Sequence, residues 1–215
     1  MSVLVYGIAQ RGDRPVAGPG LGGQPLRGVH AEPLVAIVSD YQDPPARPAT
    51  QTMWDYERIV ERIAELHPFI PARFGSVLND DDAVREMLRE RREQFLEVLS
   101  HTRGAVELAL RASWDQPSEP PSQTGAGYMR ARLELRQRAR EVAQELMPLG
   151  KLSRTSRCEL PARPQQPLRC AYLVDREAVT EFTASLAELD QRLPGVELVC
   201  TGPWPPYSFV QEVTG

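Results

Sequence analysis

Cysteine is the residue type in this chain whose chemistry is most readily recognised from spacing, and the chain has 3 of them. Cys158, Cys170 and Cys200 all lie in the second half, in segments whose residue patterns predict strands. A structural zinc site draws on closely spaced cysteines and histidines, but this half has neither a CxxC pair nor a histidine. We therefore interpret the three cysteines as small buried apolar residues rather than metal ligands.

The histidines and serines do not show the spacing of a nucleophilic catalytic centre. His30, His67 and His101 lie far apart in the sequence. His67 and His101 fall near the expected C-terminal ends of helices, where a cationic side chain interacts favourably with the helix dipole. A GxSxG nucleophile motif is missing from the sequence. We therefore predict no nucleophilic catalytic centre, and a triad assembled from distant residues stays open only as a disfavoured alternative.

Two further segments resemble ligand sites but lack part of the required pattern. The loop GPGLGGQP, residues 18–25, has the glycines of a phosphate-binding loop, but neither the Lys-Ser/Thr pair nor a helix follows it. A surface loop is the better interpretation. The acidic run at residues 79–82 carries carboxylates that suit Mg²⁺ or Ca²⁺, yet it directly precedes a predicted helix. Capping of that helix explains the run, so we predict no metal site.

A locally basic segment, residues 122–157, suggests binding to a partner. On a helical wheel its apolar residues Tyr128, Leu135, Ala139, Val142 and Leu146 form one stripe. Arginines flank this stripe on one side and glutamates on the other, namely Arg132, Arg136 and Arg140 against Glu134, Glu141 and Glu145. Such flanking charge is typical of a helix docked on another protein surface, and this interpretation is favoured over a nucleic-acid interface because base-stacking aromatic strands are missing.

The C-terminal segment TGPWPPYSFV is a second candidate contact surface. Trp204, Tyr207 and Phe209 alternate there with prolines that stiffen an extended backbone. We favour an arm packed on the core of the second domain, and a strip that binds a partner stays open as the alternative.

The elements that would position these residues are separated by proline, of which the chain has 20. Four windows contain none, residues 49–67, 72–116, 122–147 and 168–193. The polar, proline-rich stretch near residue 120 is the predicted linker between two domains. We place the N-terminal domain at residues 1–116, the linker at 117–127 and the C-terminal domain at 128–215.

Within these domains the apolar spacing alternates between strand and helix patterns. A central strand is predicted at 2–9, with Val3, Val5 and Gly7 on one face and Leu4, Tyr6 and Ile8 on the other. Helices are predicted at 52–67, with Leu66 on the buried face, and at 81–101, and Asp175 is expected to cap the helix that follows it. The mixed order predicts an α+β fold, with a small, mostly antiparallel sheet of ferredoxin-like character in each domain.

Charge and hydropathy limit the function classes further. The chain has 215 residues and a net charge of -4, so it lacks the overall basic field that attracts nucleic acid or anionic lipid. The start of the sequence, MSVLVYGIAQRG, lacks the pattern of a signal peptide, and no apolar run is long enough to span a membrane. We expect a soluble, cytoplasmic protein that binds neither nucleic acid nor a membrane.

Four segments together resemble the gas vesicle protein F/L family. They are the opening VLVYGI, the segment IPARFGSVLNDDDAVREML with the following GAVELALRASW, the helix start GAGYMRARLELRQRA and the ending TGPWPPYSFV. They occur in the family's order from the first strand to the last residues.

This resemblance implies an accessory protein of gas vesicles, with two α+β domains and without catalytic residues or cofactors. Its expected partners are the small hydrophobic shell protein and other vesicle accessory proteins, and its expected location is the cytoplasm or the gas vesicle itself. Residues Arg132, Arg136, Arg140, Trp204, Tyr207 and Phe209 are the candidate partner contacts. A ferredoxin-like regulatory or nucleic-acid-binding protein remains the alternative.

Overall fold

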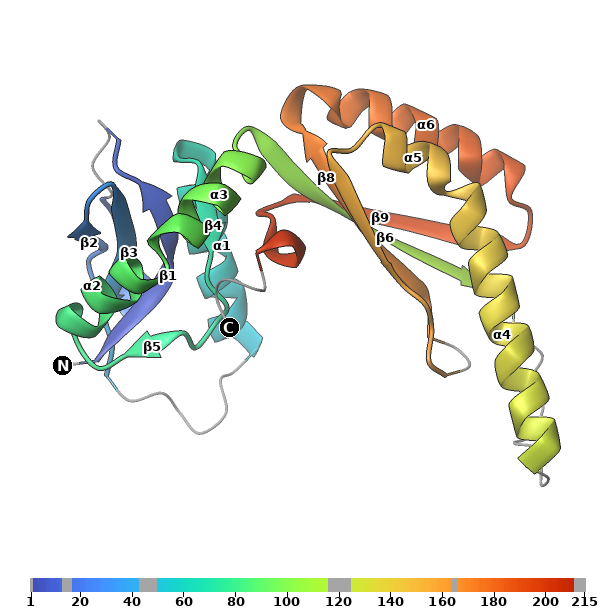
Figure 1. The fold of residues 1–215 in the computed structure, drawn as a ribbon, viewed down its shortest axis with the longest axis horizontal. Helices are drawn as coiled ribbons and strands as arrows, with labels where there is room; N and C mark the ends of the chain where they lie inside the picture. Colours follow the sequence, from blue (N-terminus) through green and yellow to red (C-terminus); the bar gives the residue numbers. More distant parts are fainter. Residues whose placement is uncertain (1, 13–16, 43–49, 116–124, 164–165, 211–215) are drawn as a thin grey trace. The chain divides into compact units, whose positions relative to one another are not determined.

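The chain folds into two compact units, each built from one sheet and its helices. The computed structural model describes residues 2–12, 17–42, 50–115, 125–163 and 166–210. Unit 1 comprises the residues up to Gly104 together with the C-terminal residues from Trp204, and unit 2 comprises Ala105–Pro203 (Figure 1). The predicted α+β class with two domains is confirmed.

The sheet of unit 1 is built around its first strand. Strand β1 lies between β3 and β4, the described strand order is β2-β3-β1-β4, and β5 pairs with the other end of β1. These pairs are antiparallel. The strands are β1 (Val3–Gln10), β2 (Arg27–Ala31), β3 (Leu34–Asp40), β4 (Phe69–Pro71) and β5 (Val77–Leu78).

Helices cover both faces of this sheet. Helix α1 (Thr50–Leu66) packs on one face through Tyr56 and Val60. Helices α2 (Asp81–Glu90) and α3 (Arg92–Thr102) pack on the other through Leu88 and Phe95 (Figure 1). Apolar character on both faces of β1 therefore reflects a central strand with a core on each side, as predicted.

The predicted assignment of β1 side chains to faces is wrong after Tyr6. Val3, Val5 and Ile8 lie in the core beneath α2 and α3, whereas Leu4 and Tyr6 face α1. The register with β3 shifts between Val5 and Gly7, and such a bulge reverses the alternation of the residues that follow it. A Cβ on Gly7 would lie 2.2 Å from the Ile70 carbonyl oxygen, so this position needs glycine.

Two of the predicted helices differ from expectation, one in its continuity and the other in the exposure of its last residue. The helix predicted at 81–101 is interrupted at Arg91, whose ψ of 20° separates α2 from α3. Leu66, expected in the buried face of α1, is 52% exposed because it occupies the helix's last position.

The two predicted aspartate caps have opposite outcomes. Asp80 accepts a hydrogen bond of 2.9 Å from the Ala83 amide and caps α2, as the acidic run predicts. Asp175 does not cap the turn that follows it; its carboxylate accepts from the guanidinium of Arg154 instead. The competing guanidinium of Arg154, the residue just before β7, explains the difference.

Unit 2 follows the order β-α-β-β-α-β, with strands arranged β7-β8-β6-β9. This arrangement, in which the first and third strands are central, is that of ferredoxin-like folds. Its elements are β6 (Ala105–Trp114), α4 (Gly125–Glu145), α5 (Met147–Lys151), β7 (Thr155–Glu159), β8 (Leu168–Asp175), α6 (Val179–Arg192) and β9 (Val196–Trp204).

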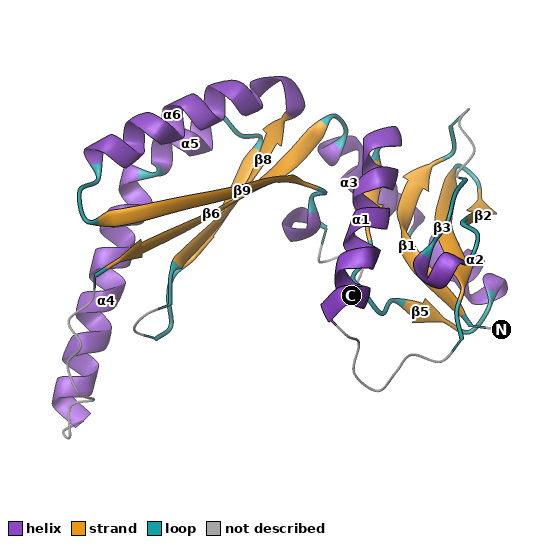
Figure 2. Cartoon of the chain, turned by 180° about the vertical axis from the view of Figure 1, so that it is seen from behind, coloured by secondary structure: helices purple, strands orange, loops and turns teal. Residues whose placement is uncertain are grey.

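The helices of unit 2 cover one face of its sheet (Figure 2). The core contains Leu110 and Tyr172 from the central strands, Val142 from α4, Leu149 from α5 and Phe182 from α6. The ring of Tyr172 meets Phe182 edge to face at 5.1 Å, and burial raises the pKa of the Tyr172 hydroxyl to about 12. Within the described ranges, none of the helices combines the length and apolar character needed to cross a bilayer.

The boundary between the units lies earlier in the chain than residues 117–127. Strand β6 pairs with β8 from Ala105 to Ala112, so it belongs to the second sheet and not to the N-terminal domain. The hydrogen bonds between β6 and β8, rather than the proline-rich composition near residue 120, therefore decide where the second unit begins. Residues 117–124 of the expected linker lie outside the described residues, and 125–127 open helix α4.

Candidate partner-binding surfaces

The interpretation of all three cysteines as buried apolar residues is wrong for Cys158, which is exposed. Cys170 is buried as expected, but it is also bonded to another cysteine. Cys158 is exposed on β7 and lies directly opposite the buried Cys170 on β8, and the two form a disulfide. Cys200 is free and half-buried, and burial raises the pKa of its thiol. The sequence predicts both strands but not their register, which decides whether two cysteines face each other.

Replacing Cys158 with serine is expected to lower the stability of unit 2 by about 3 kcal/mol, because the unfolded chain loses a covalent loop closure. Chemical unfolding measures the change, and Cys200→Ser serves as the matched control because that thiol is unbonded. Thiol labelling of the denatured chain should detect one reactive cysteine before reduction and three afterwards. Three reactive thiols without reductant would contradict the disulfide.

Within the described ranges, the histidines and acidic residues do not gather at a common point. His101 lies in the last turn of α3, and His67 follows the end of α1, where its amide donates to the Ile63 carbonyl. Among the acidic residues, Asp81 accepts two hydrogen bonds of 2.8 Å from Arg27. In the part of the chain that the structure describes, no group of His, Cys, Asp and Glu has a metal-binding arrangement.

The glycine-rich loop packs against its own unit and is stabilised by internal hydrogen bonds. The Leu21 amide donates to the Tyr6 hydroxyl at 2.7 Å, and the Gly20 and Gly23 amides donate to carbonyl groups within the loop. These three N–H groups are therefore already satisfied and do not point toward a phosphate site. The loop's amides stabilise the fold around Tyr6.

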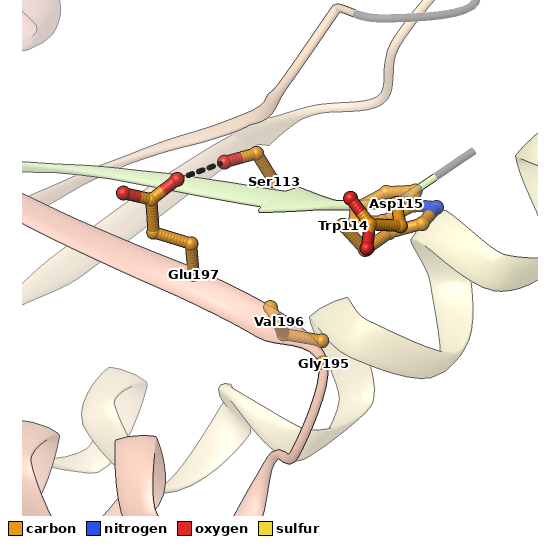
Figure 3. Close-up of a pocket in the computed structure, with 6 residues that line it drawn as sticks. All are labelled: Ser113, Trp114, Asp115, Gly195, Val196 and Glu197. Atoms are coloured by element: carbon orange, nitrogen blue, oxygen red, sulfur yellow. Dashed lines mark hydrogen bonds between the residues drawn. The ribbon is translucent and has the colours of Figure 1, made fainter.

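A hollow of about 420 Å³ lies where β6 ends and β9 begins, lined by Ser113, Trp114, Asp115, Gly195, Val196 and Glu197 (Figure 3). The Ser113 hydroxyl donates to Glu197 Oε2 at 3.3 Å across it. Its described lining has two carboxylates and a serine but neither histidine nor lysine, so the Ser-His and Ser-Lys pairs typical of nucleophilic serine enzymes are missing from it.

The C-terminal residues belong to unit 1, not to the core of the second domain as the favoured interpretation expected. Tyr207 packs beside the core of α1, and its hydroxyl donates to Glu57 Oε2 at 3.0 Å. Val210 is buried in the core beneath α2 and α3. Phe209 is half-buried, and Trp204 is 37% exposed. The structure thus places Tyr207 in an intramolecular contact and leaves Trp204 the most accessible of the three aromatic candidates.

Glu57→Gln is expected to stabilise unit 1 at pH 7. Burial raises the pKa of Glu57 in the folded chain, and the hydrogen bond from Tyr207 only partly opposes this. Folding therefore favours the protonated form of Glu57. Its contribution to the free energy of unfolding is fully present below the pKa of the unfolded chain and is lost as the pH rises through the raised pKa of the folded chain. Glutamine stays neutral and its carbonyl still accepts from Tyr207.

Thermal unfolding measured from about pH 4 to about pH 8, an interval that includes the titration of a glutamate with a raised pKa, tests this effect. The gain of Glu57→Gln should shrink as the pH falls toward 4. Glu65→Gln removes the same charge from an exposed position of the same helix and is the control. An equal gain at every pH would show that burial of the Glu57 charge is not the cause.

The arginines predicted for partner contact lie together on α4. Arg136 and Arg140 are exposed and Arg132 is half-buried, with intervals of four residues that place them on one side of the helix. The buried stripe of α4 consists of Leu135, Ala139 and Val142, as predicted. Tyr128, assigned to the same stripe, is 53% exposed. The arginine side of α4 therefore faces solvent, while the tail candidates lie in the other unit.

Known proteins resemble this chain over nearly its whole length. Residues 2–211 match the family model described as gas vesicle synthesis protein GvpL/GvpF. Gas vesicle protein F of Streptomyces sp. (strain CB03234) is 28% identical over 240 residues, which cover 98% of this chain and 100% of that protein. Gas vesicle protein L of the same strain is 28% identical over 246 residues, covering 95% and 91%.

Two crystal structures share the fold. The gas vesicle protein GvpF from Anabaena sp. PCC7120 superposes with a TM-score of 0.83, covering 98% of this chain and 96% of that one. GvpF from Microcystis aeruginosa gives 0.80, with 98% and 99% covered. Both are 17% identical in sequence, so this likeness shows the fold alone.

Proposed function

Since the chain belongs to the gas vesicle synthesis protein GvpL/GvpF family and therefore has a role in gas vesicle formation, we propose that it acts there as a non-enzymatic assembly factor. In this role it binds the small hydrophobic shell protein and other vesicle proteins, in the cytoplasm or on the vesicle. The family match over residues 2–211 is the observation that carries the proposal.

The chemistry of assembly gives such a factor a clear task. A shell protein that polymerises into a wall exposes apolar surface before it is incorporated, and exposed apolar strands pair with one another without control. A partner that covers this surface prevents aggregation until the subunit is added. The exposed arginine side of α4 and the partly exposed Trp204 are the surfaces that support this role.

Two measurements test the proposal at separate levels. Deleting the gene for this chain from its vesicle cluster should abolish or deform vesicles in electron micrographs, and the intact gene should restore them. The tagged chain should co-purify with the shell protein from cells that express the cluster. An unrelated tagged protein is the control, and it should capture much less of the shell protein. If the tagged chain captures no vesicle component at all, the binding role is overturned.

Reversing the charge of Arg132, Arg136 and Arg140 tests the arginine contacts. The three glutamate substitutions should weaken co-purification and leave the melting temperature nearly unchanged, because two of the side chains are exposed. A clear fall in melting temperature would instead make the arginines structural residues of unit 2.

A further inference from the structure

Among the residues that the structure describes, none forms a core beneath the first half of α4. Residues 125–134 contain no buried side chain, whereas Leu135, Ala139 and Val142 in the following turns are buried. Figures 1 and 2 both show this end of the helix projecting past the sheet of unit 2. Packing on an apolar face is what normally stabilises such a segment. Its exposed side chains are therefore a candidate surface for a partner that supplies the packing.

Apolar and basic side chains share one side of this segment. At about 100° per residue, Met129, Leu133, Arg136 and Arg140 fall within an arc of roughly 60°, and Arg132 borders it. Met129 is 55% exposed and Leu133 is 63% exposed. We name these five residues the α4 stripe. Its apolar end covers the first turns, and its basic end continues toward the buried half of the helix.

The charge of the α4 stripe has a single sign. The glutamates of the helix, Glu134, Glu141 and Glu145, lie on the opposite side. Glu141 pairs there with Arg138 at 3.4 Å. Among the described residues, no carboxylate pairs with Arg136 or Arg140, and the Nε atom of Arg132 is buried without a hydrogen-bond partner. The guanidinium groups of the exposed Arg136 and Arg140 therefore remain available for an acidic partner.

We propose that the α4 stripe docks an acidic amphipathic helix of another gas vesicle protein, an inference that rests on the proposed function. Leucine-like side chains of the partner cover Met129 and Leu133, and its carboxylates pair with Arg132, Arg136 and Arg140. The arginines recur every four residues, or about 6 Å along the axis, which matches carboxylates at the same interval on a second helix. Paired charges beside an apolar seam are how helices select partners.

Two features favour a helix over a nucleic acid. The exposed Met129 and Leu133 would stay uncovered beneath a phosphate backbone, whereas an amphipathic helix buries them. The whole chain also carries a net charge of -4, which disfavours phosphate binding except at a local patch.

The test uses the full chain and a fluorescent synthetic peptide of about 20 residues, with glutamates at every fourth position beside a leucine stripe. Fluorescence anisotropy should show binding that weakens as salt is raised. Arg136→Glu with Arg140→Glu, and separately Met129→Ser with Leu133→Ser, should each weaken it about tenfold or more. A peptide with lysines in place of the glutamates should not bind.

Arg130→Glu with Arg138→Glu is the matched control, because it makes the same change in net charge on other sides of the same helix. This variant should keep its affinity within about twofold. Equal losses in both charge variants would overturn the α4 stripe and indicate a diffuse electrostatic effect. Competition by a single-stranded oligonucleotide at equal affinity would overturn it in favour of nucleic acid.

Co-purification separates this inference from the proposed function. If the native chain captures vesicle proteins and the Met129→Ser, Leu133→Ser variant captures them equally well, the α4 stripe is not the docking surface and the proposed function stands. If the native chain captures none of them, the binding role fails whatever the peptide does.

Discussion

Replacing Tyr56 with alanine is expected to destabilise unit 1 by about 3–5 kcal/mol, the range for removing a large aromatic side chain from a core. Tyr56 is fully buried between α1 and the sheet. Its ring stacks on Tyr6 at 5.3 Å and meets Phe74 edge to face at 5.2 Å. The cavity would open at the central strand, where the surrounding backbone has little freedom to collapse. Chemical unfolding followed by the near-UV signal of unit 1 measures the loss.

Tyr56→Phe separates the hydroxyl from the ring. The hydroxyl donates to the Ala72 carbonyl at 2.8 Å and lies 3.1 Å from the Val5 carbonyl, so one hydrogen serves two buried acceptors. Losing it should cost about 1–3 kcal/mol, less than the alanine substitution. Tyr128→Phe, at an exposed position of α4, is the control and should change little. If Tyr56→Phe cost as much as Tyr56→Ala, the ring packing would not be the main contribution.

The inward positions of α1 show how much of this fold periodicity predicts. Tyr56, Ile59, Val60 and Ile63 are buried at the spacing expected of an amphipathic helix. Spacing does not report irregularities that tertiary contacts impose. The bulge in β1 lies where β4 approaches Gly7 closely, and the interruption at Arg91 separates two helices within one apolar pattern.

Contacts between distant segments account for the remaining differences. The pairing of Cys158 with Cys170 depends on the register of two strands. The return of Tyr207 to Glu57 joins residues 150 positions apart, which no local pattern encodes.

The candidate surface on α4 was predictable only in part. The spacing of Arg132, Arg136 and Arg140 predicts one basic side, and the structure places all three on it. The sequence does not reveal that the core ends before the helix does. For that reason Tyr128 resembles a core residue, and the exposed pair Met129 and Leu133 attracts no notice until the sheet beneath is located.

Phe182→Ala is expected to lower the stability of unit 2 by about 3–5 kcal/mol. Phe182 is fully buried on α6 and packs against Tyr172 of the central strand β8. The same core contains Val142 of α4 and Leu146, the residue just after this helix, which hold the second half of α4 on the sheet. Hydrogen exchange should therefore rise in α4, α6 and β8 together. Glu181→Ala, an exposed neighbour on α6, is the control.

The same substitution distinguishes loss of support from loss of contact at the α4 stripe. Phe182→Ala leaves every residue of the stripe in place but reduces the fraction of chains in which α4 is anchored, so peptide affinity should fall in proportion to that fraction. Lowering the temperature from the midpoint of unfolding toward the maximum of stability should restore it. Arg136→Glu with Arg140→Glu should show no such recovery. Weak binding by Phe182→Ala under conditions where unit 2 is fully folded would contradict the rigid support assigned to α4.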